Sequence, residues 1–222
     1  MSTPKTQGEK PMRKRILVFA SGDAEGGGSG FENLVVDFSK ETDPEIVAVV
    51  SNHADGGVQK RARRLQVPFL HMEKPFTAEK YQELARSTKA DLVALSGWLK
   101  LVRGLDPTKT LNIHPGPLPR FGGAGMYGHF VHEAVMEAYK RGEVTDSAVT
   151  MHFVTPQFDE GPVCFVCKVP IKKDDTPHTL GKRVNEAEHY WQPKITKMVA
   201  DGEISWNGDS NSPPTKVIRA IW

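Results

Sequence analysis

The stretch Ile16-Leu-Val-Phe-Ala-Ser-Gly-Asp-Ala-Glu-Gly-Gly-Gly-Ser-Gly-Phe31 decides the fold. It begins with an apolar run, 16–19, of the kind found in strands that are buried on both faces of a sheet. A glycine-rich loop follows and leads into an amphipathic run, 31–40, that predicts a helix. Glycine lets backbone N–H groups approach a ligand at a helix N-terminus, so the loop is a candidate phosphate site, with a flexible turn as the alternative.

This loop matches neither of two common nucleotide-binding motifs. Gly22 and Gly27 have the spacing of a P-loop, but Gly28 stands where the phosphate-binding lysine should be. Starting from Gly28 and Gly30, the third glycine of a dinucleotide fingerprint would fall on Asn33. The loop therefore indicates anion binding without indicating a nucleotide.

Outward from this stretch, apolar and amphipathic runs alternate. The pattern predicts an α/β fold, Rossmann-like, with a mostly parallel sheet and helices on both faces. The expected strands are 16–19, 46–50, 68–71, 92–95 and 110–113, and the expected helices are 31–40, 58–65 and 77–87. A Pro/Gly-rich loop (115–128), a helix (129–141), a C-terminal β-hairpin (148–154 with 163–169) and a long helix (176–200) follow. Thr176 is the expected N-cap of that helix, and the polar tail 207–214 is expected to be loose.

Bulk properties exclude several classes of partner. A length of 222 residues with 38% hydrophobic content favours one domain, 1–222. The net charge of +2 comes from mixed basic and acidic residues, so we expect no nucleic-acid partner. No apolar run approaches the roughly 20 residues of a membrane span, and we expect a cytoplasmic protein without membrane association.

Metal binding is not expected. Cys164 and Cys167 lie in an apolar run, and strand residues three apart point to opposite faces. Two buried, inert thiols are therefore favoured over a redox pair or half a zinc site. The eight histidines are scattered without the spacing of metal ligands.

The segment Leu111-Asn-Ile-His-Pro115 is the strongest candidate for catalysis. Asn112 and His114 are two residues apart on an expected strand and share a face. A carboxamide can hydrogen-bond a developing oxyanion, and an imidazole can move a proton near neutral pH. A histidine at a strand end can also be a structural hydrogen-bonding group, and the pair alone leaves both interpretations open.

Other motifs accompany this pair. Leu118-Pro-Arg120 follows it, and Met151-His-Phe-Val-Thr155 leads into Asp159-Glu-Gly-Pro-Val163. In this combination the chain resembles the phosphoribosylglycinamide formyltransferase family over roughly residues 15–206. The resemblance implies transfer of a formyl group from 10-formyltetrahydrofolate, as co-substrate, to the amine of glycinamide ribonucleotide in purine biosynthesis. It implies small-molecule partners and a monomer or homodimer.

The resemblance also implies the site residues. Asn112 would bind the formyl oxygen, His114 would be the general acid or charge stabiliser, and Asp159 would raise the pKa of His114. Without the resemblance, Asp159 would be a turn-forming residue. The N-terminal half, 14–110, would bind phosphate, and the C-terminal half, 111–206, would carry catalysis and folate binding.

Three sets of binding residues follow from the same resemblance. They are Gly28, Ser29 and Gly30 for the substrate phosphate, Asn185 and Glu188 for the ribose and amine, and Trp98, Leu99, Lys100, Leu101, Val102, Asn112 and Thr155 for folate. The alternatives are a core position for Trp98 and a solvated helix face for the 185–188 pair. His129 and His132 are expected on a helix surface, and whether one of them takes the place of another histidine of the family stays open.

Four other functions stay open. A formyltetrahydrofolate hydrolase, a methionyl-tRNA formyltransferase and an amino-sugar-nucleotide formyltransferase would share the Asn-His-Asp trio. The hydrolase and the tRNA enzyme usually carry an additional domain, for which we expect no room in this sequence. A phosphometabolite-binding module would need the glycine loop but not the trio.

Overall fold

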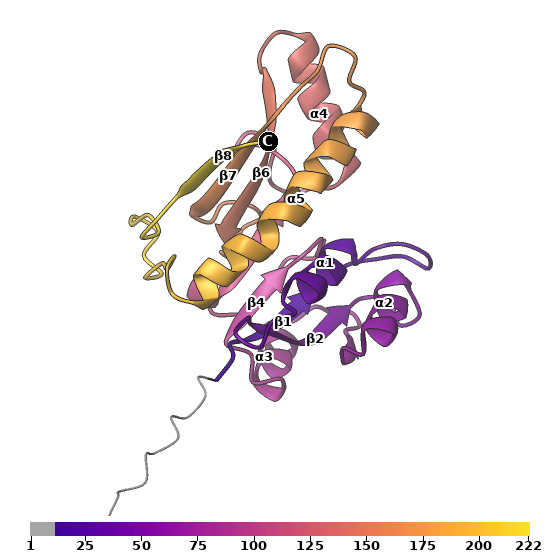
Figure 1. The fold of residues 1–222 in the computed structure, drawn as a ribbon, viewed down its shortest axis with the longest axis vertical. Coiled ribbons are helices and arrows are strands. Elements are labelled where there is room, and N and C mark those ends of the chain that lie inside the picture. The colour runs from indigo at the N-terminus through magenta and orange to yellow at the C-terminus, as the bar shows by residue number, and fades with distance from the viewer. Residues whose placement is uncertain (1–11) are drawn as a thin grey trace, which may run out of the picture.

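The structure is a computed structural model that describes residues 12–222, and residues 1–11 of the expected domain lie outside it. In the described residues, eight strands form one sheet in the order β3-β2-β1-β4-β5-β6-β7-β8 (Figure 1). Strands β3, β2, β1, β4 and β5 are parallel to one another. Strand β6 is antiparallel to both of its neighbours, and β8 is parallel to β7. The strands are β1 (Arg15–Phe19), β2 (Glu45–Ser51), β3 (Phe69–His71), β4 (Leu92–Leu95), β5 (Thr110–His114), β6 (Asp146–Phe153), β7 (Val163–Pro170) and β8 (Ile218–Ile221).

Five α-helices and one short 3-10 helix complete the described part of the chain. They are α1 (Ser29–Asp37), α2 (Gly57–Leu65), α3 (Ala78–Ser87), η1 (Pro107–Lys109), α4 (His129–Lys140) and α5 (Pro177–Ala200). Thr176 caps α5 as expected, because its side chain accepts the backbone N–H of Thr179. The α5 helix runs diagonally across the molecule and contacts both α1 and α4 (Figure 1).

Alternate residues of β1 explain why this strand is apolar throughout. Ile16 and Val18 belong to one buried cluster, and Leu17 and Phe19 belong to a second. The sheet is therefore buried on both faces here, which confirms the expected α/β fold with a mostly parallel sheet. The expected β-hairpin is also confirmed, as the antiparallel pair of β6 and β7.

The C-terminal region differs from expectation. Residues 207–214 were expected to be loose, which is wrong, because the Trp206 indole donates to the carbonyl oxygens of Asp209 and Ser212, both at 3.0 Å. These bonds turn the chain so that β8 can pair with β7. β8 was not expected, since four residues at a sheet edge carry little periodic signal.

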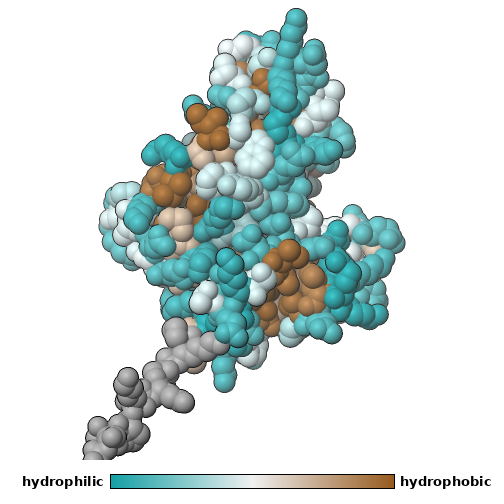
Figure 2. Space-filling model, viewed as in Figure 1, coloured by the Kyte–Doolittle hydropathy of each residue, from teal (hydrophilic) through white to brown (hydrophobic). Residues whose placement is uncertain are grey.

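Other properties agree with the sequence analysis. Cys164 and Cys167 are both buried in β7, and burial raises the pKa of the Cys164 thiol to about 12, as expected for an inert thiol. Between residues 12 and 222, no helix is long and apolar enough to cross a membrane. The face seen in Figure 2 is mainly hydrophilic, with hydrophobic side chains gathered in separate patches.

The order of the strands indicates where a ligand-binding crevice is expected, at the carboxyl ends of β1 and β4. Strand β1 lies between β2 and β4, so the connection from β1 to β2 and the connection from β3 to β4 run in opposite directions across the sheet. In open α/β sheets, ligands bind outside the carboxyl ends of strands at such a point. The glycine-rich loop, residues 96–102 and the end of β5 all follow carboxyl ends in this region.

Candidate active site

A cavity of about 850 Å³ opens at the carboxyl ends of β1, β4 and β5. Its lining includes residues from the glycine loop, the 95–102 segment, the end of β5, the 123–133 segment, the 152–159 segment and α5. A volume in this range suits small-molecule substrates. Every predicted site residue lines this cavity.

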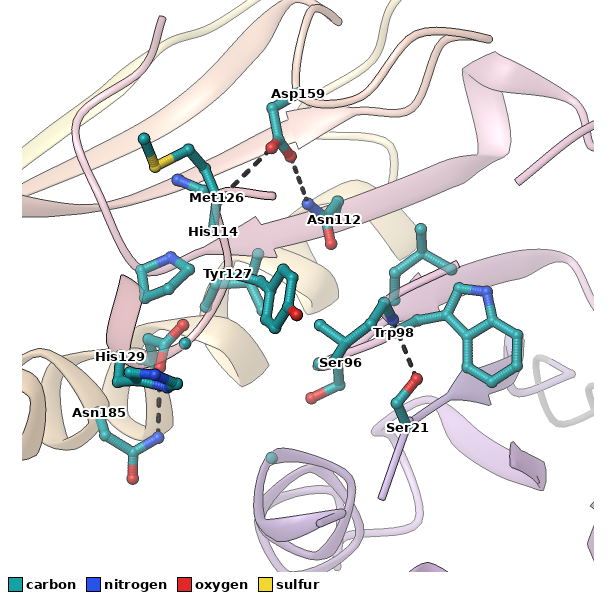
Figure 3. A pocket seen from close by; sticks show the side chains of 18 of the residues that line it. Ser21, Ser96, Trp98, Asn112, His114, Met126, Tyr127, His129, Asp159 and Asn185 are labelled. Atoms are coloured by element: carbon teal, nitrogen blue, oxygen red, sulfur yellow. Dashed lines mark hydrogen bonds and ion pairs between the residues drawn. The ribbon is translucent and has the colours of Figure 1, made fainter. Parts of the chain in front are cut away.

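Asn112, His114 and Asp159 converge at one end of the cavity (Figure 3). The Asn112 Nδ2 donates to Asp159 Oδ1 at 3.2 Å, and His114 Nδ1 lies 3.6 Å from Asp159 Oδ2. The first two residues share a face of β5, as their spacing predicts. The carboxylate arrives from the loop between β6 and β7, so separate chain segments build the trio.

Tight backbone packing holds Asp159 in place. Its φ of 57° lies in the left-handed region, which aspartate tolerates better than most residues. A Cβ at Gly161 would clash with the carbonyl oxygen of Phe153, so the turn needs glycine there. Gly123 donates its backbone N–H to Asp159 Oδ2 at 3.0 Å, which fixes the second carboxylate oxygen.

His114 has a defined tautomer and a lowered pKa. It is 3% exposed, and its Nε2–H donates to the Phe121 carbonyl oxygen at 2.7 Å, which leaves Nδ1 toward Asp159. Burial lowers the pKa of His114, and the Asp159 charge raises it by less. The expected raising effect of Asp159 on the His114 pKa is therefore confirmed, but desolvation of the imidazolium outweighs this Coulomb attraction, so the net pKa is lowered. At neutral pH the ring is neutral.

His152 was not assigned a role from the sequence, although it stands in the quoted 151–155 motif. It pairs with Asn112 across β5 and β6, and its Nδ1–H donates to the Phe153 carbonyl oxygen at 2.8 Å. In the neutral ring, Nε2 then accepts from Asn112 Nδ2 at 3.1 Å. Both amide hydrogens of Asn112 thus have partners, and its amide oxygen points away from Asp159 (Figure 3).

The surroundings of Asp159 have opposing effects on the pKa of its carboxyl group. Burial works to raise the pKa of Asp159, but the neighbouring imidazoles of His152 and His114 and the hydrogen bond from the Gly123 N–H together hold it below its usual value. Asp159 is therefore ionised near neutral pH. It presents a fixed negative charge to both imidazoles.

The glycine loop ends in a left-handed turn that starts α1. Gly28 is the N-cap with φ 80°, a conformation that favours glycine, and Ser29 is the first helical residue. The first N–H groups of a helix have no partner inside it, and here they lie at the cavity. A Cβ at Gly30 would clash with Ser96 Oγ and lie 3.0 Å from Gln192 Oε1, so the helix start packs directly against its neighbours.

The segment 98–102, which was expected to bind folate, lines the cavity but includes one side chain that packs in the core. Trp98 is 6% exposed, and its indole packs against Phe19 and donates to Tyr81 Oη at 3.0 Å, so its ring belongs to the core even though the residue lines the cavity. Leu99 is exposed, and its backbone N–H donates to Ser21 Oγ at 3.0 Å. Lys100, Leu101 and Val102 continue the lining.

Thr155 presents an unsatisfied polar atom on the other wall of the cavity. Its Oγ1 is buried and has no hydrogen-bond partner among residues 12–222. Buried polar atoms are nearly always paired. A bound molecule could supply the missing partner.

On α5, Asn185 and Glu188 lie together, since Asn185 Nδ2 donates to Glu188 Oε2 at 3.2 Å. Burial raises the pKa of Glu188 to about 7, against the hydrogen bond from Asn185. Asn185 is exposed and Glu188 is half-buried, so the alternative of a solvated helix face applies to Asn185 and only in part to Glu188. His189 lies 3.3 Å from Ser29 Oγ through Nε2, which joins α5 to the glycine loop.

The two histidines of α4 differ. His129 is exposed, as expected for a helix surface, but His132 is 8% exposed, so the expected surface position is wrong for it. His132 follows the apolar face of α4, whose buried residues include Val131, Val135 and Met136. Among the described residues, no group of three or more His, Cys, Asp or Glu side chains could hold a metal ion.

Comparisons with known proteins agree with this geometry. Residues 14–196 match the sequence model of the formyl transferase family. The chloroplastic phosphoribosylglycinamide formyltransferase of Arabidopsis thaliana is 33% identical over 212 residues, which cover 90% of this chain and 70% of that protein. The trifunctional purine biosynthetic protein adenosine-3 of Gallus gallus is 32% identical over 86% of this chain, which spans 19% of that protein. A crystal structure of phosphoribosylglycinamide formyltransferase from Anaplasma phagocytophilum matches with a TM-score of 0.78 at 28% identity, over 95% of this chain and 99% of that chain.

Proposed function

Since the chain belongs to the formyl transferase family, we propose that it transfers the formyl group of 10-formyltetrahydrofolate to the amine of glycinamide ribonucleotide. The family membership confirms the resemblance that the 112–115, 151–155 and 159–163 motifs carry in the sequence. The proposed reaction is a step of purine biosynthesis. It makes the protein a one-carbon transferase.

One observation carries the proposal: a carboxamide, an imidazole and a carboxylate meet at one end of a cavity whose other end holds a helix N-terminus. Asn112, His114 and Asp159 form the first group, and the start of α1 after Gly28 is the second. A helix N-terminus favours a phosphate group through its free N–H groups and its dipole. The cavity therefore suits a substrate with a reacting amine at one end and a phosphate at the other.

Direct attack by the amine needs no enzyme nucleophile. The amine nitrogen forms a bond to the formyl carbon and loses a proton, the carbonyl oxygen becomes an oxyanion, and the bond from that carbon to the folate nitrogen breaks as this nitrogen gains a proton. We propose that His114 accepts the first proton at Nδ1 and returns it to the leaving nitrogen. Asp159, 3.6 Å away, stabilises the imidazolium between these steps.

Asn112 would stabilise the oxyanion. Both of its amide hydrogens have partners in the unliganded site, so the formyl oxygen would take one of them from His152 or Asp159. Catalytic hydrogen bonds often align only when substrate is bound. One such donor contributes about 3 to 4 kcal/mol of transition-state stabilisation.

The remaining residues would bind the two substrates. Gly28, Ser29 and Gly30 would take the phosphate, while Asn185 and the partly protonated Glu188 would take the ribose and amine. The 98–102 segment and Thr155 would hold the folate, for which the unpaired Thr155 Oγ1 offers a free hydrogen bond. In this arrangement residues 14–110 supply the phosphate site and residues 111–206 the catalytic groups.

Cellular context stays a prediction. We predict a cytoplasmic location, a monomer or homodimer, and an activity without a metal ion. The Arabidopsis relative is described as chloroplastic. Size-exclusion chromatography with light scattering would measure the oligomeric state.

An absorbance assay for tetrahydrofolate release tests the proposed function. The protein is incubated with 10-formyltetrahydrofolate and, in separate reactions, glycinamide ribonucleotide, an amino sugar nucleotide, or no amine. We expect turnover with glycinamide ribonucleotide that exceeds the other two by at least about a hundredfold, as expected when a matched substrate positions the reacting amine. Equal release without an amine would indicate a hydrolase, and a preference for the sugar nucleotide would also contradict the proposal.

A further inference from the structure

His132 is a buried polar residue that the catalytic scheme does not use. It is 8% exposed and lines the cavity, yet neither ring nitrogen forms a hydrogen bond within residues 12–222. Nδ1 is sealed from solvent, whereas Nε2 is not among the sealed, unpaired atoms. A buried histidine without partners in a substrate cavity indicates that a bound molecule completes its hydrogen bonding.

The packing of α5 fixes the position of this ring. A Cβ at Gly181 would lie 2.6 Å from His132 Cδ2 and 3.0 Å from its Nε2, so only glycine leaves room for the imidazole. Glycine inside a helix is unfavourable relative to alanine. Its presence on the face of α5 that meets His132 is explained by this contact.

The ring is neutral and donates from Nε2. Burial lowers the pKa of His132 from its ordinary 6.5 to about 4, and the charges of His114 and His129 act in the same direction. A neutral imidazole carries its proton on one nitrogen only. A sealed N–H without an acceptor is more costly than a sealed lone pair, so the proton belongs on Nε2, at the accessible side of the ring.

The neighbours of His132 suit contact with the middle of the proposed substrate. Glycinamide ribonucleotide runs from the amine through one methylene to the amide carbonyl, and then to the ribose and the phosphate. In the proposed binding mode the amine reacts at His114, while Asn185 and Glu188 on α5 bind the ribose and the amine. His132 stands close enough to His114 to be influenced by its charge, and it packs against α5 one helical turn before Asn185.

We infer that His132 binds the amine substrate by donating its Nε2–H to the carbonyl oxygen of the glycinamide group. This inference rests on the proposed function and goes beyond it by assigning the group that recognises the amide. His132 would thereby distinguish amino-acyl amides from simple alkylamines. It would also hold the amine at the correct distance from the formyl carbon.

The test compares two amines in two proteins. The amines are glycinamide ribonucleotide and its analogue with a methylene in place of the carbonyl, and the proteins are the wild type and His132→Phe, which keeps a ring but removes the donor. For the wild type we expect a KM about five- to tenfold lower for glycinamide ribonucleotide than for the analogue, the value of one neutral hydrogen bond. His132→Phe should lose this difference, with an unchanged KM for 10-formyltetrahydrofolate.

Two further variants keep the test decisive if His132→Phe folds poorly. His132→Gln places an amide N–H near the position of Nε2 and should restore at least half of the discrimination, whereas Gly181→Ala should displace the ring and abolish it with the histidine still present. Thermal unfolding checks that each variant is folded. Discrimination that survives in His132→Phe or in Gly181→Ala would overturn the inference, as would a wild type that does not distinguish the amines.

Failure of the proposed function would give a different result. Wild-type protein that transfers no formyl group to glycinamide ribonucleotide would remove both the function and the inference. Wild-type turnover combined with unaltered variants would remove the inference alone.

Discussion

Replacing Asp159 by asparagine removes one charge from the trio with little change in shape. The carboxamide oxygen can still accept the Gly123 N–H, so the backbone contact at 3.0 Å is retained. What is lost is the attraction between the carboxylate and the imidazolium that His114 becomes during transfer. At the observed 3.6 Å, and with an effective dielectric constant of about 20, this attraction is about 4 to 5 kcal/mol.

Part of that attraction is offset when water and neighbouring dipoles rearrange, so a loss of about 2 to 3 kcal/mol, or about 30- to 150-fold in kcat, is the expected effect. Asp159→Asn should also lower the pKa of His114 further, because the Asp159 charge raises it. A base that must be neutral then stays active at lower pH, so the acid limb of kcat/KM should move to lower pH. Tetrahydrofolate release between about pH 5 and 9 measures both quantities.

Two results would refute this reasoning. Turnover of Asp159→Asn within about threefold of wild type would mean that no imidazolium forms next to this carboxylate. An acid limb that moves to higher pH would show that the Asp159 charge does not favour the protonated ring. Asp43→Asn, at a residue that does not line the cavity, serves as a matched control and should leave the rate and the pH profile unchanged.

Three other predictions follow from single contacts. Gly30→Ala should raise KM for glycinamide ribonucleotide at least about tenfold, since the new Cβ clashes with Ser96 Oγ and displaces the start of α1. Ser29→Ala should change this KM less than about threefold. Equal effects of the two substitutions on KM would contradict the proposed phosphate site. The neutral form of His132 should contribute up to about 3 kcal/mol to the free energy of unfolding above pH 6.5. This contribution is lost as the pH falls toward 4, because the unfolded chain takes up the proton first. Urea titrations at several pH values should show this decrease in the free energy of unfolding for wild type and not for His132→Phe. Thr176→Ala should lower the free energy of unfolding by about 1 kcal/mol, measured by urea denaturation.

Sequence periodicity predicted the parts of the site that lie on one element. Asn112 and His114 share a face because β5 is a strand, and the end of that strand was placed within one residue. Asp159 is 47 residues from Asn112, and only the resemblance brought it to the trio. No local pattern encodes how a loop after β6 folds back over β5.

The contact of His152 with Asn112 and the burial of His132 were not predicted from the sequence, for different reasons. His152 meets Asn112 through the register of β5 and β6, and a sequence does not fix the register of two strands joined by a long connection. His132 carried a readable signal, since it lies four residues before Met136 and one after Val131 on the apolar stripe of α4. A polar residue within an apolar stripe predicts burial, and burial without a partner predicts a ligand.

Glycine has two distinct uses around the trio, which explains why the 115–128 loop is so rich in it. Gly123 and Gly125 have φ values of 95° and 87°, so the backbone conformation requires glycine there. Gly116 and Gly122 do not have positive φ. A Cβ at Gly116 would clash with Val131 Cγ1 and lie 3.2 Å from His114 Nε2, and a Cβ at Gly122 would clash with Leu118 Cδ2 and lie 3.0 Å from the Asp159 Cβ. At these two positions glycine is needed because the backbone itself forms the wall against the catalytic side chains. Alanine at Gly122 would therefore move Asp159 and impair catalysis, while alanine at Gly125, where no atom lies near the new Cβ, would strain only the loop.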